Sequence, residues 1–173
     1  MKTRIHESTL DKKYDERKAH RLTLLFVVIA VLIVIYLALQ FIIGISRVDG
    51  TSMVPTLSDS QTVVYWRQTN SYSTGDVICV KMPSGELYVK RIVAVAGDVV
   101  ELKDGVLYVN GFAEENSYAN GETYEEDGLI SYPYVVGRGK YFVLGDNREA
   151  SVDSRSFGAV VQEQVLGKLV GVE

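Results

Sequence analysis

Hydrophobic positions follow two different patterns, and the chain divides between them near residue 45. From Leu22 to Ile45 the sequence reads LTLLFVVIAVLIVIYLALQFIIGI, 24 residues without a charged side chain. A helix needs about 20 residues to cross a bilayer, and a helix on a soluble core would carry a polar face. This segment has no such face. The pattern therefore predicts a transmembrane helix over residues 22–45, preceded by a tail over residues 1–21.

After the apolar run, short segments rich in Val, Ile and Tyr alternate with turn residues: TVVYWRQ, DVICVKM, ELYVKRIVAVA, DVVELKDGVLYVN, KYFVLGD and GAVVQEQVLGKLVGV. This alternation is typical of strands, and LKDGVLYVNG predicts a hairpin that turns at Asp104-Gly105. We therefore expect residues 46–173 to form a mainly β domain of coiled antiparallel sheets, barrel-like in shape. Residues 113–139 are polar, acidic and glycine-containing, which predicts a surface excursion.

The apolar segment differs from a removable signal peptide. Such peptides have an apolar region of about 7–15 residues followed by an A-x-A-like cleavage site. Here the apolar run is longer, and the sequence that follows it, GISRVDG, contains no such site. The segment therefore predicts an uncleaved membrane anchor.

Charge predicts the orientation of that anchor. Seven of the 18 basic residues and four of the 22 acidic residues precede the span, and Arg47 is the nearest basic residue beyond it. Because positive charge stays on the cytoplasmic side, we expect a cytoplasmic tail, a single-pass span in the cell membrane and an extracytoplasmic domain over residues 46–173.

The composition of the outer domain excludes several functions. It keeps 11 of the 18 basic and 18 of the 22 acidic residues, a balance that does not suit nucleic acid. Both histidines, His6 and His20, lie in the tail, so the outer domain can hold no Ser-His-Asp triad, no Cys-His pair and no histidine-ligated zinc. The single cysteine, Cys79, lies between apolar neighbours and predicts buried packing.

One serine and one lysine could replace a histidine-based triad. Ser52 lies in DGTSMVPTL, where a turn serine is the commoner interpretation. Lys90 lies within ELYVKRIVAVAGD, on the same strand face as Tyr88, Ile92 and Ala94. An edge lysine that reaches water is one interpretation. The other is a buried general base, because burial lowers the pKa of a lysine and a neutral amine can accept the serine proton.

Three segments together resemble the bacterial type I signal peptidases, and most closely the Gram-positive branch. The resemblance rests on SMVPTL from Ser52, on YVKRIVAVAGD from Tyr88 and on GDNREASVDSRSFG from Gly145, in this order behind one N-terminal anchor. It implies a serine endopeptidase that cleaves signal peptides from exported preproteins. No metal or other cofactor is implied.

The resemblance implies a role for each matching residue. Ser52 would be the nucleophile, with its backbone N–H as one oxyanion donor, and Lys90 would be the general base. Ser151 matches a serine that hydrogen-bonds the lysine. Where some relatives have a serine that supplies the second oxyanion donor, this chain has Gly50. Two supporting ion pairs are expected, and their members are Asp153, Arg155, Asp146 and Arg91.

The resemblance also implies a substrate and partners. Signal peptides carry small side chains at the first and third positions before the cut. The residues expected to line shallow pockets for those side chains are Val48, Met53, Leu57, Tyr88 and Val89. Ordinary core packing is the competing interpretation of these five. The expected partners are preprotein signal peptides and the lipid bilayer, and the secretion translocon is a further candidate.

Other functions remain open at this point. One is a membrane-anchored Ser-Lys peptidase dedicated to a pilin or to a single exported protein. A second is a non-catalytic assembly or chaperone module on the same fold, which the intact Ser52 and Lys90 argue against. A third is a self-cleaving Ser-Lys repressor, which the anchor and the lack of a DNA-binding module disfavour.

Overall fold

The computed structural model describes residues 2–69, 71–115, 117–127 and 129–172. The chain divides into two compact units, residues 1–41 and residues 42–173. The mainly β fold and the single N-terminal apolar helix confirm the fold class predicted from the sequence.

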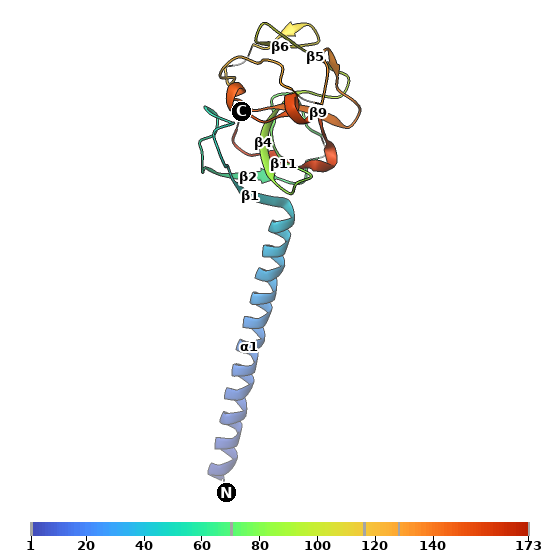
Figure 1. Ribbon diagram of the computed structural model, residues 1–173. Coiled ribbons are helices and arrows are strands. Elements are labelled where there is room, and N and C mark those ends of the chain that lie inside the picture. The colour runs from blue at the N-terminus through green and yellow to red at the C-terminus, as the bar shows by residue number, and fades with distance from the viewer. Residues whose placement is uncertain (1, 70, 116, 128, 173) are drawn as a thin grey trace. The chain divides into compact units, whose positions relative to one another are not determined.

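The first unit is a single helix, α1 (Lys2–Ile42), coloured blue to cyan in Figure 1. No glycine or proline interrupts it. Within residues Arg17–Ile42, an 18-residue window reaches a mean hydropathy of 3.2, so this part of the helix is long and apolar enough to cross a membrane. The helix ends three residues before the boundary expected from hydropathy, because Ile43 begins a strand that pairs with a neighbouring strand.

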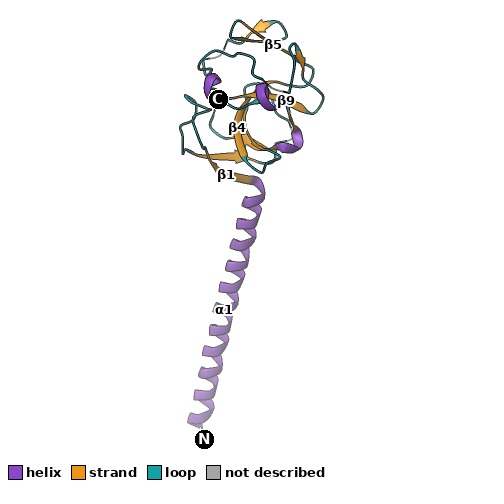
Figure 2. Ribbon diagram, in the orientation of Figure 1, coloured by secondary structure: helices purple, strands orange, loops and turns teal. Residues whose placement is uncertain are grey.

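Seven antiparallel strands form the larger sheet of the second unit, in the order β1-β2-β11-β3-β4-β9-β10. Figure 2 shows these strands in orange, joined by long loops. Their bounds are β1 (Ile43–Arg47), β2 (Thr62–Trp66), β3 (Val77–Lys81), β4 (Leu87–Ala94), β9 (Lys140–Leu144), β10 (Val160–Val161) and β11 (Val165–Leu169).

A smaller sheet has the strand order β7-β6-β5-β8. Its bounds are β5 (Val99–Lys103), β6 (Val106–Val109), β7 (Phe112–Ala113) and β8 (Tyr134–Val135). The predicted hairpin is confirmed: Lys103 pairs with Val106, and the two turn residues Asp104 and Gly105 both have positive φ, as a tight turn between twisted strands requires.

The described residues of the second unit also form three short helices: η1 (Arg148–Ala150), α2 (Ser154–Phe157) and η2 (Gln162–Gln164). Two of them follow β9 in the polar segment GDNREASVDSRSFG, and the backbone there is held mainly by side chains rather than by a sheet.

One hydrophobic core cluster holds the loop between β1 and β2 in place. Val48, Met53 and Leu57 of this loop pack with residues of β2, β3, β4 and β11. Met53 and Leu57 are almost completely buried, which contributes about 1.5–3 kcal/mol each to the free energy of unfolding. Ser52 therefore precedes a side chain that is fixed in the core.

Residues 113–139, expected as a surface excursion, are mostly exposed where the structure describes them. The segment nevertheless sends buried side chains inward: Thr123 is 3% exposed and Val136 is 1% exposed. Val136 packs in the cluster beneath the smaller sheet.

Candidate active site

Ser52 is presented by a loop that is fixed on both sides. On one side Met53 is buried in the core, and its carbonyl accepts a hydrogen bond of 2.8 Å from the Leu57 amide. On the other side Asn147 donates its backbone N–H to the Ser52 carbonyl at 3.0 Å and its side-chain amide to the Thr51 carbonyl at 3.2 Å. The loop therefore offers the half-buried Ser52 hydroxyl in one defined position.

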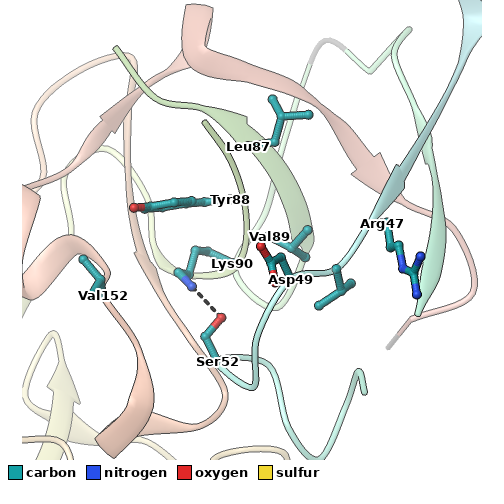
Figure 3. A pocket seen from close by; sticks show the side chains of 9 residues that line it. Arg47, Asp49, Ser52, Leu87, Tyr88, Val89, Lys90 and Val152 are labelled. Atoms are coloured by element: carbon teal, nitrogen blue, oxygen red, sulfur yellow. Dashed lines mark hydrogen bonds between the residues drawn. The ribbon is translucent and has the colours of Figure 1, made fainter. Parts of the chain in front are cut away.

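Lys90 reaches that hydroxyl from the middle of β4. Its Nζ lies 2.8 Å from Ser52 Oγ, and Figure 3 shows the amine pointing at the hydroxyl. The side chain is only 4% exposed, and its ammonium lies 5.4 Å from the centre of the Tyr88 ring. The lysine is therefore buried beside Tyr88 and does not extend into water. This placement agrees with the interpretation as a buried base and not with that of an edge lysine.

Burial changes the protonation of this lysine. It lowers the pKa of Lys90 from 10.5 to about 8, since the charged form loses hydration; Asp153 raises the pKa, Arg155 lowers it and Asp146 raises it, each by a smaller amount. About a tenth of the molecules then carry a neutral amine at pH 7. A neutral amine at hydrogen-bond distance from an alcohol can act as its general base.

Two buried ion pairs flank the serine and the lysine. Arg91 follows Lys90 on β4 and binds Asp146 through two hydrogen bonds of 2.9 and 2.8 Å. Asp146 also accepts a hydrogen bond from the Thr56 hydroxyl. The second pair joins Arg155 and Asp153, again through two hydrogen bonds, both 2.9 Å. Both pairs expected from the sequence are therefore present.

Ser151 does not make the hydrogen bond expected from the sequence. It is buried, but its hydroxyl oxygen has no hydrogen-bond partner in the described part of the chain. It lies against Gly145, where an added Cβ would overlap both the Ser151 side chain and the Ser52 carbonyl oxygen. Gly145 thus permits a close approach of these two serines that no larger residue would permit.

A pocket opens beside the serine and the lysine. Three of the five residues expected to line it, Val48, Tyr88 and Val89, do so together with Ser52 and Lys90. The other two, Met53 and Leu57, do not line this pocket and belong to the core, because the loop turns their side chains inward. The further lining residues are Arg47, Asp49, Leu87 and Val152.

The strand that carries Lys90 has an unpaired edge at this pocket. Residues Leu87–Lys90 pair with β3 on one side, whereas the pairing with β9 on the other side begins only at Arg91. An unpaired strand edge is a site where an extended peptide can add as a further strand. Among the described residues, no group of three or more His, Cys, Asp or Glu side chains is arranged to bind a metal ion.

Comparison with known proteins places the chain in a family. Residues 20–172 match the family described as "Signal peptidase, peptidase S26". The chain belongs to this family: it is an enzyme, a peptidase of the signal peptidase I type that cleaves signal peptides. Its apolar N-terminal helix accords with membrane anchoring.

Individual relatives are similar along most of the chain. Signal peptidase IB of Staphylococcus aureus is 34% identical over 154 residues, which cover 79% of this chain and 81% of the relative. Signal peptidase I of Bacillus licheniformis is 34% identical over 152 residues, 80% of this chain and 82% of the relative. A crystal structure of a signal peptidase I from Enterococcus faecalis V583 is 35% identical, with a TM-score of 0.49, and covers 58% of this chain and 98% of that chain.

Sequence reasoning missed two residues that shape the site. Asn147 holds the carbonyls of Thr51 and Ser52, although the sequence indicates only that it belongs to a polar loop. Tyr118 lies in the excursion, and the Arg91 guanidinium is 3.8 Å from the centre of its ring. No local pattern identifies Tyr118, because the contact joins segments far apart in the sequence.

Proposed function

We propose that this chain cleaves signal peptides by a Ser-Lys mechanism, with Ser52 as the nucleophile and Lys90 as the general base. One observation carries the proposal: the Lys90 amine is buried and lies 2.8 Å from the Ser52 hydroxyl. In a domain without histidine, this lysine is the base within reach of that hydroxyl. Ser-Lys pairs are a known variant of the serine triad.

The reaction would proceed in two halves. Lys90 accepts the Ser52 proton while Oγ bonds to the scissile carbonyl carbon, and the carbonyl oxygen becomes an oxyanion. When the carbon–nitrogen bond breaks, Lys90 returns the proton to the leaving amine. The signal peptide is then joined to Ser52 Oγ by an ester bond. Water attacks this ester with Lys90 again as the base. The ester carbon–oxygen bond breaks, which releases the Ser52 hydroxyl and the signal peptide carboxylate.

The oxyanion needs preorganised donors. In the described part of the chain, no acceptor takes a hydrogen bond from the Ser52 amide, which leaves this donor available for the substrate. The Gly50 amide donates to the Asp59 carboxylate at 2.8 Å and is occupied. The Ser151 hydroxyl, which has no partner in the described part of the chain, is buried, and it remains a proposed hydrogen-bond donor to the neutral Lys90 amine.

The pocket supports a preference for small side chains. It is lined by Val48, Tyr88 and Val89, and the free edge of β4 could bind an extended peptide with alternate side chains directed into the pocket. A sequence of the A-x-A type has small residues at the first and third positions before the cut, two residues apart on one strand face. We therefore propose cleavage after such sequences.

The distribution of charge supports a location outside the cytoplasm. The basic tail, residues 1–21, precedes the uncharged part of α1 that begins at Leu22, and the acidic domain follows the helix. We propose that the tail is cytoplasmic and that the domain is extracytoplasmic, where a translocated signal peptide is exposed at the membrane surface. A direct contact with the translocon is part of the same proposal.

The test uses the full chain in detergent with a preprotein that ends its signal peptide in A-x-A. Mass spectrometry of both products locates the cut. We expect one cut, directly after A-x-A, and a loss of more than about 10³-fold in kcat for Ser52→Ala and for Lys90→Ala. Two exposed residues serve as matched controls: Ser84→Ala and Lys81→Ala should retain the normal rate.

Two results would contradict the proposal. Near-normal turnover by Ser52→Ala or by Lys90→Ala, with folding unchanged by circular dichroism, would show that another group carries the chemistry. Cleavage at a sequence unrelated to A-x-A, or of one exported protein among many tested, would favour a dedicated processing enzyme.

A further inference from the structure

A buried ion pair outside the Ser52–Lys90 pair links the polar segment after β9 to the smaller sheet. Arg148 is 1% exposed, and its guanidinium binds the Glu114 carboxylate through two hydrogen bonds of 2.5 and 2.9 Å. Glu114 directly follows β7, and its amide donates to the Leu107 carbonyl of β6 at 2.8 Å. The carboxylate is therefore fixed to the smaller sheet.

Two further donors of Arg148 also have partners. Nη1 donates to the Thr123 hydroxyl at 2.9 Å, and Nε donates to the Gly145 carbonyl at 3.1 Å. The Thr123 amide donates at 2.7 Å to the carbonyl of Gly105, in the β5–β6 turn. Arg148 thus links the smaller sheet, through Glu114 and Thr123, to the backbone of Gly145. Gly145 is the residue that lies against Ser52 and Ser151.

The backbone of residues 146–148 is held from the same direction. The Asn120 amide donates to the Asp146 carbonyl at 2.7 Å, and the Arg148 amide donates to the Asn120 carbonyl at 2.8 Å. Asn147 lies between these two contacts, and its own amide donates in turn to the Ser52 carbonyl at 3.0 Å. Neighbouring amides of an extended chain point in opposite directions, so fixing residues 146 and 148 on Asn120 directs the Asn147 amide to the nucleophile loop.

The same segment also contacts the strand that carries Lys90. The Tyr118 ring lies 3.8 Å from the Arg91 guanidinium, which in turn binds Asp146. Residues near Tyr118 therefore contact both sides of the reacting pair, the loop of Ser52 through Asn147 and the strand of Lys90 through Arg91.

We propose that Glu114, Tyr118, Asn120 and Thr123 form a clamp that sets the distance between Ser52 and Lys90, and that Glu114 and Arg148 are its positioning residues. Neither touches the nucleophile: both act through the backbone of residues 145–147. The inference rests on the proposed function, because it assigns the clamp to the Ser-Lys reaction. Its consequence is that the smaller sheet, far from Ser52 in the sequence, takes part in catalysis by holding Glu114 and Thr123.

The alternative is an ion pair that only stabilises the fold. Such a pair would change the amount of folded enzyme but not the rate of each folded molecule. A positioning pair would change kcat at an unchanged folded fraction, since a displacement of about 1 Å can lower a rate by about 100-fold. It would also change the pH profile: Asp153, Arg155, Asp146 and burial set the pKa of Lys90, and a loosened site would admit water to the amine.

The experiment measures kcat and KM for a preprotein with the detergent-solubilised full chain, normalised to the folded fraction from circular dichroism. Glu114→Ala is compared with Glu115→Ala. Glu115 is an exposed neighbour, and its replacement changes the net charge by the same amount. We expect Glu114→Ala to lower kcat by about 10–100-fold with KM changed less than about threefold, and to shift the acid limb of the pH profile to higher pH.

Two further variants separate positioning from folding. Glu114→Gln keeps the shape of the side chain and one of the two oxygens that accept from Arg148, so it should recover part of the lost kcat and move the acid limb back toward its original position. Because Glu114 and Arg148 act as one unit, Arg148→Met combined with Glu114→Ala should lower kcat no further than Arg148→Met alone.

The outcomes distinguish the clamp from the Ser-Lys assignment. If Ser52→Ala and Lys90→Ala are inactive while Glu114→Ala matches Glu115→Ala per folded molecule, the clamp is wrong and the proposed function stands. A loss that disappears after normalisation, or fully additive losses in the double variant, would also overturn the clamp. If Ser52→Ala remains active, the proposed function fails and the clamp fails with it.

Discussion

At the scale of single residues, the burial of Lys90 has opposite effects on activity and on stability. A dry amine loses its proton more easily, which supplies the base that the reaction needs. The same burial is unfavourable for folding wherever the unfolded chain would hold a charged, hydrated ammonium. Two predictions follow from this one side chain, and they concern different measurements.

The first prediction is that activity rises with pH. The pKa of Lys90 is lowered to about 8, so the neutral fraction grows about tenfold from pH 6 to pH 7 and approaches saturation near pH 9. The plot of log kcat/KM against pH should therefore have a slope near one below pH 8 and become level above it. A stopped assay with the preprotein at constant ionic strength measures this profile. A level profile from pH 6 to pH 9 would exclude a lysine base.

The second prediction is that Lys90→Met stabilises the fold while it abolishes activity. The unfolded lysine keeps its proton up to pH 10.5 and the folded one only up to about 8, so the difference corresponds to roughly 3 kcal/mol against folding below pH 8. Between these two values the unfolded state binds more protons, so the stability of the native chain rises with pH and the penalty disappears above 10.5. Urea unfolding of both proteins at pH 7 and at pH 10 measures this. A gain from Lys90→Met that is no larger at pH 7 than at pH 10 would contradict the assignment of the pKa.

A third residue-scale prediction concerns Gly145. Replacement by Ala would drive a Cβ into the Ser151 side chain and the Ser52 carbonyl, both of which are backed by buried atoms. Overpacking of this kind costs about 1–3 kcal/mol and would displace Ser52. We expect Gly145→Ala to lower the midpoint of urea unfolding and to lower kcat by at least about tenfold. Gly137→Ala, where the nearest side-chain atom is 3.6 Å from the added carbon, is the control.

At the scale of elements, β4 connects the catalytic lysine to the polar segment after β9. Lys90 and the next residue, Arg91, extend from opposite faces of the strand, so the strand joins the reacting pair to the ion pair with Asp146. The side chains of Arg91 and Asp146 are 1% and 0% exposed. A charge left without its partner at this place would be strongly unfavourable, because it could not be hydrated.

The element-scale prediction is a marked loss of stability when this ion pair is broken. Asp146→Asn keeps the shape of the side chain but leaves Arg91 without a compensating charge, and we expect a loss of roughly 3–5 kcal/mol in the free energy of unfolding. Replacing both residues, as in Arg91→Met with Asp146→Leu, should recover part of this loss. Urea unfolding measures both. If Asp146→Asn unfolds at the same urea concentration as the native chain, the pair does not carry the stability assigned to it.

The sequence predicted elements well where a single segment holds the information. The apolar run, the Asp104-Gly105 hairpin and the alternation along β4 are local patterns, and each corresponds to the element expected. The helix α1 ends at Ile42, three residues before the end of the apolar run, because Ile43 pairs with Trp66 in the larger sheet. Met53 and Leu57 were expected to line the pocket because the sequence shows only that they are apolar. The conformation of the loop directs both side chains into the hydrophobic core instead.

At the scale of the whole molecule, contacts between distant segments could be predicted only where the resemblance to a known family supplied them. The resemblance joins Ser52 with Lys90, whereas Glu114, Tyr118 and Asn120 lie in a segment that showed only polarity. Their partners are 25 or more residues away along the chain. Polar composition alone does not distinguish a solvated loop from one whose side chains enter a buried network.

The last prediction concerns the independence of the two units. The three hydrophobic clusters found among the described residues consist of residues after Ile42, so the second unit contains its own core. A chain that begins at Ile42 should therefore fold without α1, with an unfolding midpoint in urea within experimental error of the full chain. It should cleave a soluble A-x-A peptide at the normal rate. Against a preprotein embedded in lipid vesicles it should be slower by about tenfold or more, because without α1 the enzyme and the substrate no longer share one surface. Equal rates on vesicles for both chains would show that α1 contributes nothing to substrate encounter. A loss on the soluble peptide would show instead that the second unit needs α1 for its active conformation.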